Sequence, residues 1–105
     1  MKKIREYLAR ILALLRAGNE NYQSDQIDTA LAGSDEDLKT YISSNELWGG
    51  AGSIADQALV EDRPSRRKLE ALLADLGELQ MAIGIVNERT DMWTSAFRKW
   101  QKEKI

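Results

Sequence analysis

The chain contains no cysteine and no histidine among its 105 residues. Without cysteine it cannot form disulfides, use a thiol nucleophile or build a thiolate metal site. Without histidine it lacks the commonest general base and the commonest transition-metal ligand. We therefore predict a protein that is not an enzyme and that holds no cofactor and no metal ion.

Long apolar runs are also absent. The longest, residues 11–15, is far shorter than the roughly 20 residues that a membrane-spanning helix needs. Residues 1–4 have the basic start of a signal peptide, but charged residues interrupt the apolar stretch that follows, and no small-residue cleavage site comes after it. We expect a cytoplasmic protein that does not bind a membrane.

No segment alternates apolar and polar residues with the period of a β-strand, whereas apolar residues recur three and four positions apart in several segments. The two clearest stripes lie in residues 1–17 and 65–83. The first consists of Ile4, Tyr7, Leu8, Ile11, Leu12 and Leu15. The second consists of Leu69, Leu72, Leu73, Leu76, Leu79 and Ile83. These stripes predict an all-α fold, a compact bundle of five or six helices in a single domain covering residues 1–105.

Capping residues place the helix boundaries. Gly18 is a natural stop for the first helix, and Asn19 is expected to cap a second helix that buries Tyr22, Ile27, Ala30 and Leu31. Capping-box spacing begins further helices at Ser34 and at Ser53, and the only proline, Pro64, suits the first turn of another.

The last third of the chain leaves two arrangements open. Residues 65–102 form either one long helix or two helices separated at Gly84 and Asn87. A final stripe of Met92, Trp93, Ala96, Phe97 and Trp100 is expected to face the core. Gly77 lies inside the strongest stripe, where glycine costs about 1 kcal/mol relative to alanine, and this predicts close packing against a neighbouring helix.

Charge is unevenly distributed although the net charge is only −2. Residues 1–18 carry five basic side chains and one acidic one, whereas residues 19–62 carry ten acidic side chains and a single basic one, Lys39. Such an acidic segment repels nucleic acid and attracts basic proteins. The alternative is a solvated acidic surface that neighbouring basic helices partly neutralise.

From this pattern we predict a protein that binds another protein, of basic character. Its most specific form is an immunity or antitoxin-like protein whose acidic segment covers a basic toxin surface, such as a nuclease active site. The predicted contact residues are Asp25, Asp28, Asp35, Glu36, Asp37 and Glu46, with Trp48 as an aromatic anchor.

A second hypothesis is small-ligand or anion binding at a glycine-rich corner formed by Gly49, Gly50, Gly52 and Ser53. Its letters match a dinucleotide-binding fingerprint, but no strand precedes them, so a nucleotide site is not expected. The same corner is explained equally by a tight structural turn. A third hypothesis is a structural homodimer that uses an exposed apolar stripe on the helix of residues 1–17.

Residues 47–56 (LWGGAGSIAD) and 87–93 (NERTDMW) resemble recurring segments of small, uncharacterised bacterial α-helical proteins, a family with a Trp-Gly-Gly-x-Gly-Ser motif. The resemblance implies no activity. It implies that the glycine-rich corner and residues 87–93 lie close together and form one polar site that includes Asn87, Arg89 and Asp91.

Overall fold

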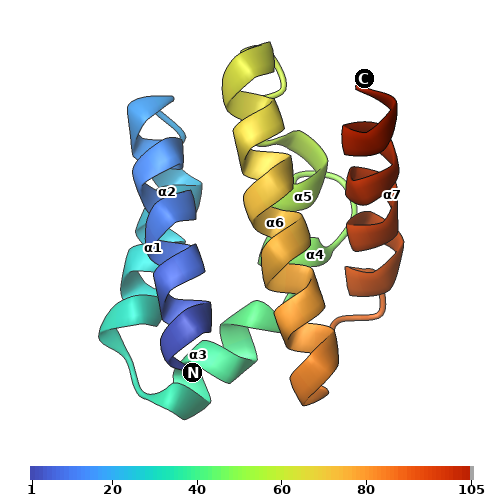
Figure 1. The fold of residues 1–105 in the computed structure, drawn as a ribbon. Helices are drawn as coiled ribbons and strands as arrows, with labels where there is room; N and C mark the ends of the chain where they lie inside the picture. The colour runs from blue at the N-terminus through green and yellow to red at the C-terminus, as the bar shows by residue number, and fades with distance from the viewer. Residues whose placement is uncertain (105) are drawn as a thin grey trace.

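The chain folds as a bundle of antiparallel and crossing helices, described in a computed structural model for residues 1–104 (Figure 1). The longer helices are α1 (Lys2–Ala17), α2 (Asn21–Ala32), α3 (Asp35–Ile42), α6 (Arg63–Ile83) and α7 (Thr90–Glu103), and single turns form α4 (Asn45–Trp48) and α5 (Ile54–Gln57). No strand occurs within these 104 residues, so the all-α bundle is confirmed.

Helix α6 runs through the middle of the bundle, with α1 on one side and α7 on the other (Figure 1). Helix α2 packs against α1, and the short helices α3, α4 and α5 carry the chain from α2 to the start of α6. Residues 33–62 thus form the connection from α2 to α6, and their buried apolar side chains are part of the core.

Local capping explains most of the observed boundaries. The capping box at the start of α3 is complete, because the Ser34 hydroxyl accepts from the Asp37 N–H and the Asp37 carboxylate accepts from the Ser34 N–H. Asp62 caps α6, with Pro64 in the first turn. The prediction of Asn19 as the cap of α2 is wrong: Asn19 has a φ of 61° in the turn after α1, and Glu20 is the cap residue.

Helices α6 and α7 are separate, which settles the question left open by the sequence. Gly84 ends α6 with a φ of 75°, a left-handed conformation that glycine adopts at little cost. The Asn87 side chain accepts from the Arg89 N–H, and Arg89, not Asn87, is the cap residue of α7. A Cβ at Gly77 would lie 1.9 Å from Thr94 Oγ1, so the predicted close packing at this glycine is confirmed.

The core follows the predicted stripes in outline. Helix α1 buries Ile4, Leu8, Ile11 and Leu15, α6 buries Leu69, Leu73 and Leu76, and α7 buries Phe97. Because the α1 stripe is covered within the chain, the homodimer hypothesis loses the exposed surface on which it was based. Three residues predicted to face the core are exposed instead, namely Tyr22, Ile83 and Met92.

None of the helices in the described part of the chain is both long enough and apolar enough to be a membrane span.

Candidate functional site

The six predicted acidic contact residues all have exposed side chains on three consecutive helices. Asp25 and Asp28 lie on α2, Glu46 lies on α4, and the remaining three, Asp35, Glu36 and Asp37, form the first turn of α3. We call these exposed carboxylates of α2, α3 and α4 the acidic surface, and those of α3 also stabilise the positive end of the helix dipole.

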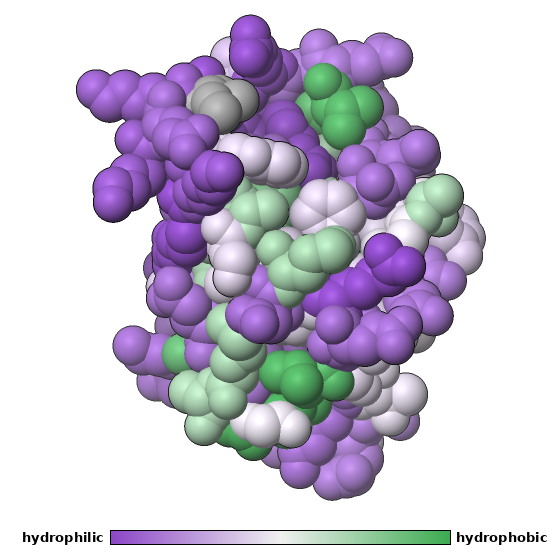
Figure 2. Space-filling view, turned by 90° about the vertical axis from the view of Figure 1, so that its right-hand side faces the viewer, coloured by the Kyte–Doolittle hydropathy of each residue, from purple (hydrophilic) through white to green (hydrophobic). Residues whose placement is uncertain are grey.

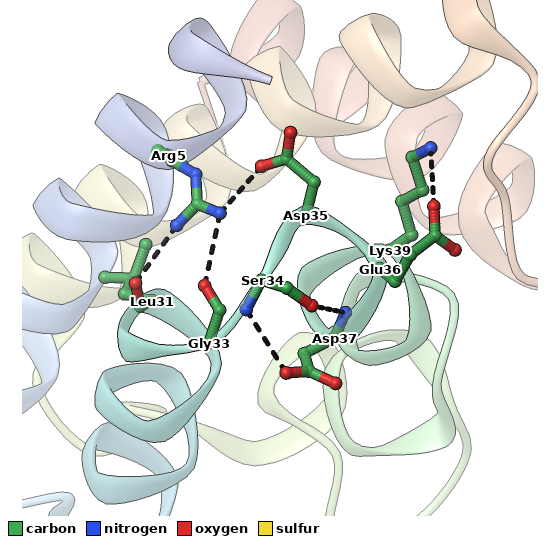
Figure 3. A network of polar contacts seen from close by, with 8 residues as sticks. All are labelled: Arg5, Leu31, Gly33, Ser34, Asp35, Glu36, Asp37 and Lys39. Atoms are coloured by element: carbon green, nitrogen blue, oxygen red, sulfur yellow. Dashed lines mark hydrogen bonds and ion pairs between the residues drawn. The ribbon is translucent and has the colours of Figure 1, made fainter.

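Two arginines of α1 pair with this acidic surface. Arg5 Nη2 lies 2.8 Å from Asp35 Oδ1, and the same guanidinium donates to the carbonyl oxygens of Leu31 and Gly33 (Figure 3). Arg16 lies 3.1 Å from Asp28. These contacts fasten α1 to the end of α2 and partly neutralise the acidic surface, as the alternative interpretation of the charge pattern expected.

The first turn of α3 is held in place by similar contacts. The Arg5 hydrogen bond lowers the pKa of Asp35 below its ordinary value of 3.8. Lys39 lies 3.3 Å from Glu36 on the same helix, and Asp37 is engaged in the capping box (Figure 3). The carboxylates of α3 are thus fixed in position while their side chains stay exposed to solvent.

A groove of about 380 Å³ lies beside these carboxylates, where α2 faces α3 and α4. We call it the α2–α4 groove, and it is lined by Gln26, Thr29, Ala30, Asp37, Thr40, Tyr41, Ser44 and Glu46. The hydroxyl oxygens of Tyr41 and Ser44 are covered and have no hydrogen-bond partner among residues 1–104. Burial raises the pKa of Tyr41, and the nearby Glu46 carboxylate raises it further, so the phenol stays protonated.

A second acidic groove, of about 410 Å³, lies where residues 57–62 pass the start of α2. Its carboxylates come from Glu20, Glu61 and Asp62. Two of these have structural contacts, because Glu20 accepts from the Leu59 N–H and Asp62 caps α6. Most carboxylates of this groove therefore have a structural role, because they hold the chain between α5 and α6 in place.

Trp48, predicted as an aromatic anchor on the surface, is completely buried. Its indole N–H donates to Gln80 Oε1 at 2.9 Å, and the Gln80 amide donates in turn to the carbonyl oxygens of Ile42 and Ile85. The absent side chain at Gly77 leaves room for the ring. Trp48 is consequently a core residue that links α4 to α6, and it cannot contact a partner in this conformation.

The sequence did contain one indication of this network. Gln80 lies seven residues after Leu73 and four after Leu76, so a polar amide stands on the apolar face of α6. A buried amide at such a position requires hydrogen-bond partners. The pattern could not identify Trp48 as one of them, because the two residues are 32 positions apart.

The polar groups of the glycine-rich corner bond to one another. The Ser53 hydroxyl donates to the Gly49 carbonyl at 2.6 Å and accepts from the Asp56 N–H. The Gly52 N–H points to the Asp56 carboxylate, and the Ser53 N–H donates to the Gly50 carbonyl. Because α5 is a single turn and the Ser53 hydroxyl engages the Asp56 N–H within the corner, this geometry favours the structural interpretation.

The two segments that carry the family resemblance are adjacent in space. A Cβ built at Gly50 would lie 3.8 Å from the Arg89 guanidinium, and Asn87 donates to the Ser43 carbonyl and to Asn45. The expected proximity is confirmed. The bonds of Asn87 join the start of α7 to the α3–α4 connection, which gives this residue a structural role.

The opposite side of the molecule has a different character. Figure 2, which faces the α7 side, shows apolar residues gathered low on the face, where the chain passes from α6 to α7. The exposed apolar residues of this region are Met81, Ile83, Val86 and Met92. Higher on the bundle, Arg66 is not free for binding, because its guanidinium bonds to Glu70 and to the carbonyl oxygens of Ile54 and Ala58.

No group of three or more metal-ligating side chains occurs within residues 1–104. Comparisons of the chain with models of protein families, with curated proteins and with solved structures found no match. The resemblance to small bacterial helical proteins stays a prediction.

Proposed function

We propose that this protein works by binding a basic protein through the acidic surface of α2, α3 and α4. The observation that supports the proposal best is the concentration of exposed carboxylates on three consecutive helices that contribute one lysine of their own. An acidic surface of this kind is what an immunity or antitoxin protein would need to cover a cationic active site, such as that of a nuclease toxin.

The arrangement suits fast and selective association. Charge of one sign on one side of a small protein steers an oppositely charged partner and raises the association rate. The ion pairs that Arg5 and Arg16 make with this surface are solvent-exposed, and such pairs contribute little to stability. A partner's arginines and lysines can therefore compete for the same carboxylates without unfolding the helices.

The test compares two charge-reversed variants that have the same net charge. In the first, Asp25, Asp28 and Glu36 are changed to lysine. In the second, the exposed acidic residues Glu88, Asp91 and Glu103 near α7 are changed to lysine, which alters the net charge equally but on another surface. Tagged wild-type and variant proteins are used to capture partners from host lysate at low and high salt.

We expect a basic protein that the wild type and the α7-side variant retain at low salt and that the α2–α3 variant loses. With this partner purified, the association rate of the wild type should fall with salt, and the α2–α3 variant should associate at least about tenfold more slowly. Equal binding by the two variants, or binding that salt does not weaken, would overturn the proposal.

Circular dichroism and thermal unfolding of both variants serve as the control for folding. All six positions are exposed, so the changes in stability should be small.

A further inference from the structure

The α2–α4 groove differs from the rest of the acidic surface because it combines charge with buried polar atoms that lack partners. The only formally charged residues in its lining are the carboxylates Asp37 and Glu46. The covered hydroxyl oxygens of Tyr41 and Ser44 have no hydrogen-bond partner in the described part of the chain. Buried polar atoms are normally satisfied, so these two hydroxyls, each able to accept as well as donate, favour a polar group in the groove.

The other polar residues of the lining point to the same kind of ligand. The hydroxyls of Thr29 and Thr40 donate to carbonyl oxygens one turn earlier in their own helices, which leaves their oxygens as acceptors. Acceptors therefore predominate in the groove, and none of the described residues that line it is a cation. A positively charged donor fits this chemistry, whereas an anion would meet two carboxylates.

Tyr22 adds an aromatic surface beside the groove. It lies four and seven residues before Gln26 and Thr29, on the same face of α2, and it is 66% exposed. Gln26 and Thr29 both line the groove, so this face of α2 leads from Tyr22 to it. A large exposed aromatic ring next to carboxylates is suited to stacking with a planar cation.

We propose that the α2–α4 groove receives the guanidinium group of one arginine from the basic protein partner, an inference that rests on the proposed function. Arginine presents five N–H donors in a planar fork and remains charged at all relevant pH values. It can donate to Glu46 and Asp37 and to the unpartnered hydroxyls while its plane stacks with Tyr22. Lysine offers three donors from a single point and no plane to stack, so it satisfies fewer of these groups.

The groove is tested first with a small probe on the full chain. Isotope-labelled protein is titrated with N-acetylarginine amide while backbone amide chemical shifts are followed by NMR. N-acetylcitrulline amide has nearly the same shape without the charge, and N-acetyllysine amide has the charge without the plane. We expect saturable shifts at the residues of the α2–α4 groove with the arginine probe, weaker ones with lysine and none with citrulline.

Two variants then assign the contacts. Glu46→Gln removes a charge from the groove, and Tyr41→Phe removes the hydroxyl, and each should weaken the arginine probe about fivefold, the loss of one charge-assisted or buried hydrogen bond in an open site. Glu61→Gln is the matched control, because it removes a charge from the other acidic groove and should leave affinity unchanged. Equal effects of Glu46→Gln and Glu61→Gln, or equal shifts with citrulline, would overturn the inference.

The same variants separate this inference from the proposed function once the partner is in hand. If reversal of Asp25, Asp28 and Glu36 abolishes binding while Glu46→Gln and Tyr41→Phe bind as tightly as the wild type, the acidic surface is the interface and the arginine site is refuted. If the arginine probe occupies the groove but both charge-reversed variants capture partners equally, the proposed function is refuted and the preference of the groove for guanidinium stands.

Discussion

Replacement of Gly77 by alanine is expected to destabilise the protein, although alanine is the better helix former by about 1 kcal/mol. The new Cβ would lie 1.9 Å from Thr94 Oγ1 and 3.3 Å from the Trp48 ring. Both neighbours are buried, with Thr94 3% exposed and Trp48 0% exposed, so neither can move into solvent. Overpacking of this kind costs about 1–3 kcal/mol, and an overlap this close belongs at the upper end.

Subtracting the gain in helix propensity leaves a net loss of about 1–2 kcal/mol in the free energy of unfolding. Urea denaturation followed by tryptophan fluorescence measures this loss directly. For a chain of this length each kcal/mol corresponds to a decrease of about 4–8 °C in the melting temperature, which a thermal scan would resolve.

A double-mutant cycle with Thr94→Ala tests the cause of the loss. Within residues 1–104 the Thr94 hydroxyl has no hydrogen-bond partner, so removing it breaks no bond there and relieves the overlap with the new methyl group. We expect a coupling energy of about 1–2 kcal/mol in favour of the double variant. Ser95→Ala, at the next and exposed position of α7, is the control and should not couple with Gly77→Ala.

The reasoning is refuted if Gly77→Ala is as stable as the wild type, because helix propensity would then outweigh the steric conflict. Additive effects of Gly77→Ala and Thr94→Ala would also refute it, since the conflict would lie elsewhere.

Two further predictions concern single contacts. Trp48→Phe should lower the free energy of unfolding by about 2–4 kcal/mol in urea denaturation, because it leaves the buried Gln80 oxygen without its donor and opens a small cavity. A loss below about 0.5 kcal/mol would contradict the core role of Trp48. Arg5→Gln should raise the pKa of Asp35 toward 3.8 in an NMR titration. Because the folded-state pKa is lowered, the Arg5–Asp35 pair stabilises the wild type above about pH 4, and this contribution is lost as the pH falls through the lowered pKa. An unchanged Asp35 pKa in the variant would show that the pair is not formed in solution.

The sequence predicted the helices and several of their ends, because these depend on residues three or four positions apart. The stripe of Leu8, Ile11 and Leu15 is buried as expected, and the Ser34–Asp37 capping box forms as its spacing indicated. The predicted start of α2 was wrong because asparagine is suited both to a helix N-cap and to a left-handed turn. Asn19 adopts the left-handed turn.

The candidate site could be predicted only in part. The composition of residues 19–62 identified an acidic segment, and the six acidic residues predicted as contacts are exposed on α2, α3 and α4, whereas Trp48 is buried. Which carboxylates are paired depended on α1, because Arg5 reaches Asp35 from 30 positions away. The glycine-rich corner was equally ambiguous from the sequence, since its composition does not show whether Ser53 and Asp56 bond within the turn or to a ligand.

By itself, the sequence determined an all-α chain, its amphipathic faces and the segregation of its charges, all of which follow from local periodicity and composition. Only tertiary contacts decided that Trp48 is buried against Gly77 while Tyr22 stays exposed. The physical reason is that burial of a side chain depends on which distant surfaces meet it. An aromatic residue on a thin apolar stripe has the same pattern whether a neighbouring helix covers it or leaves it free.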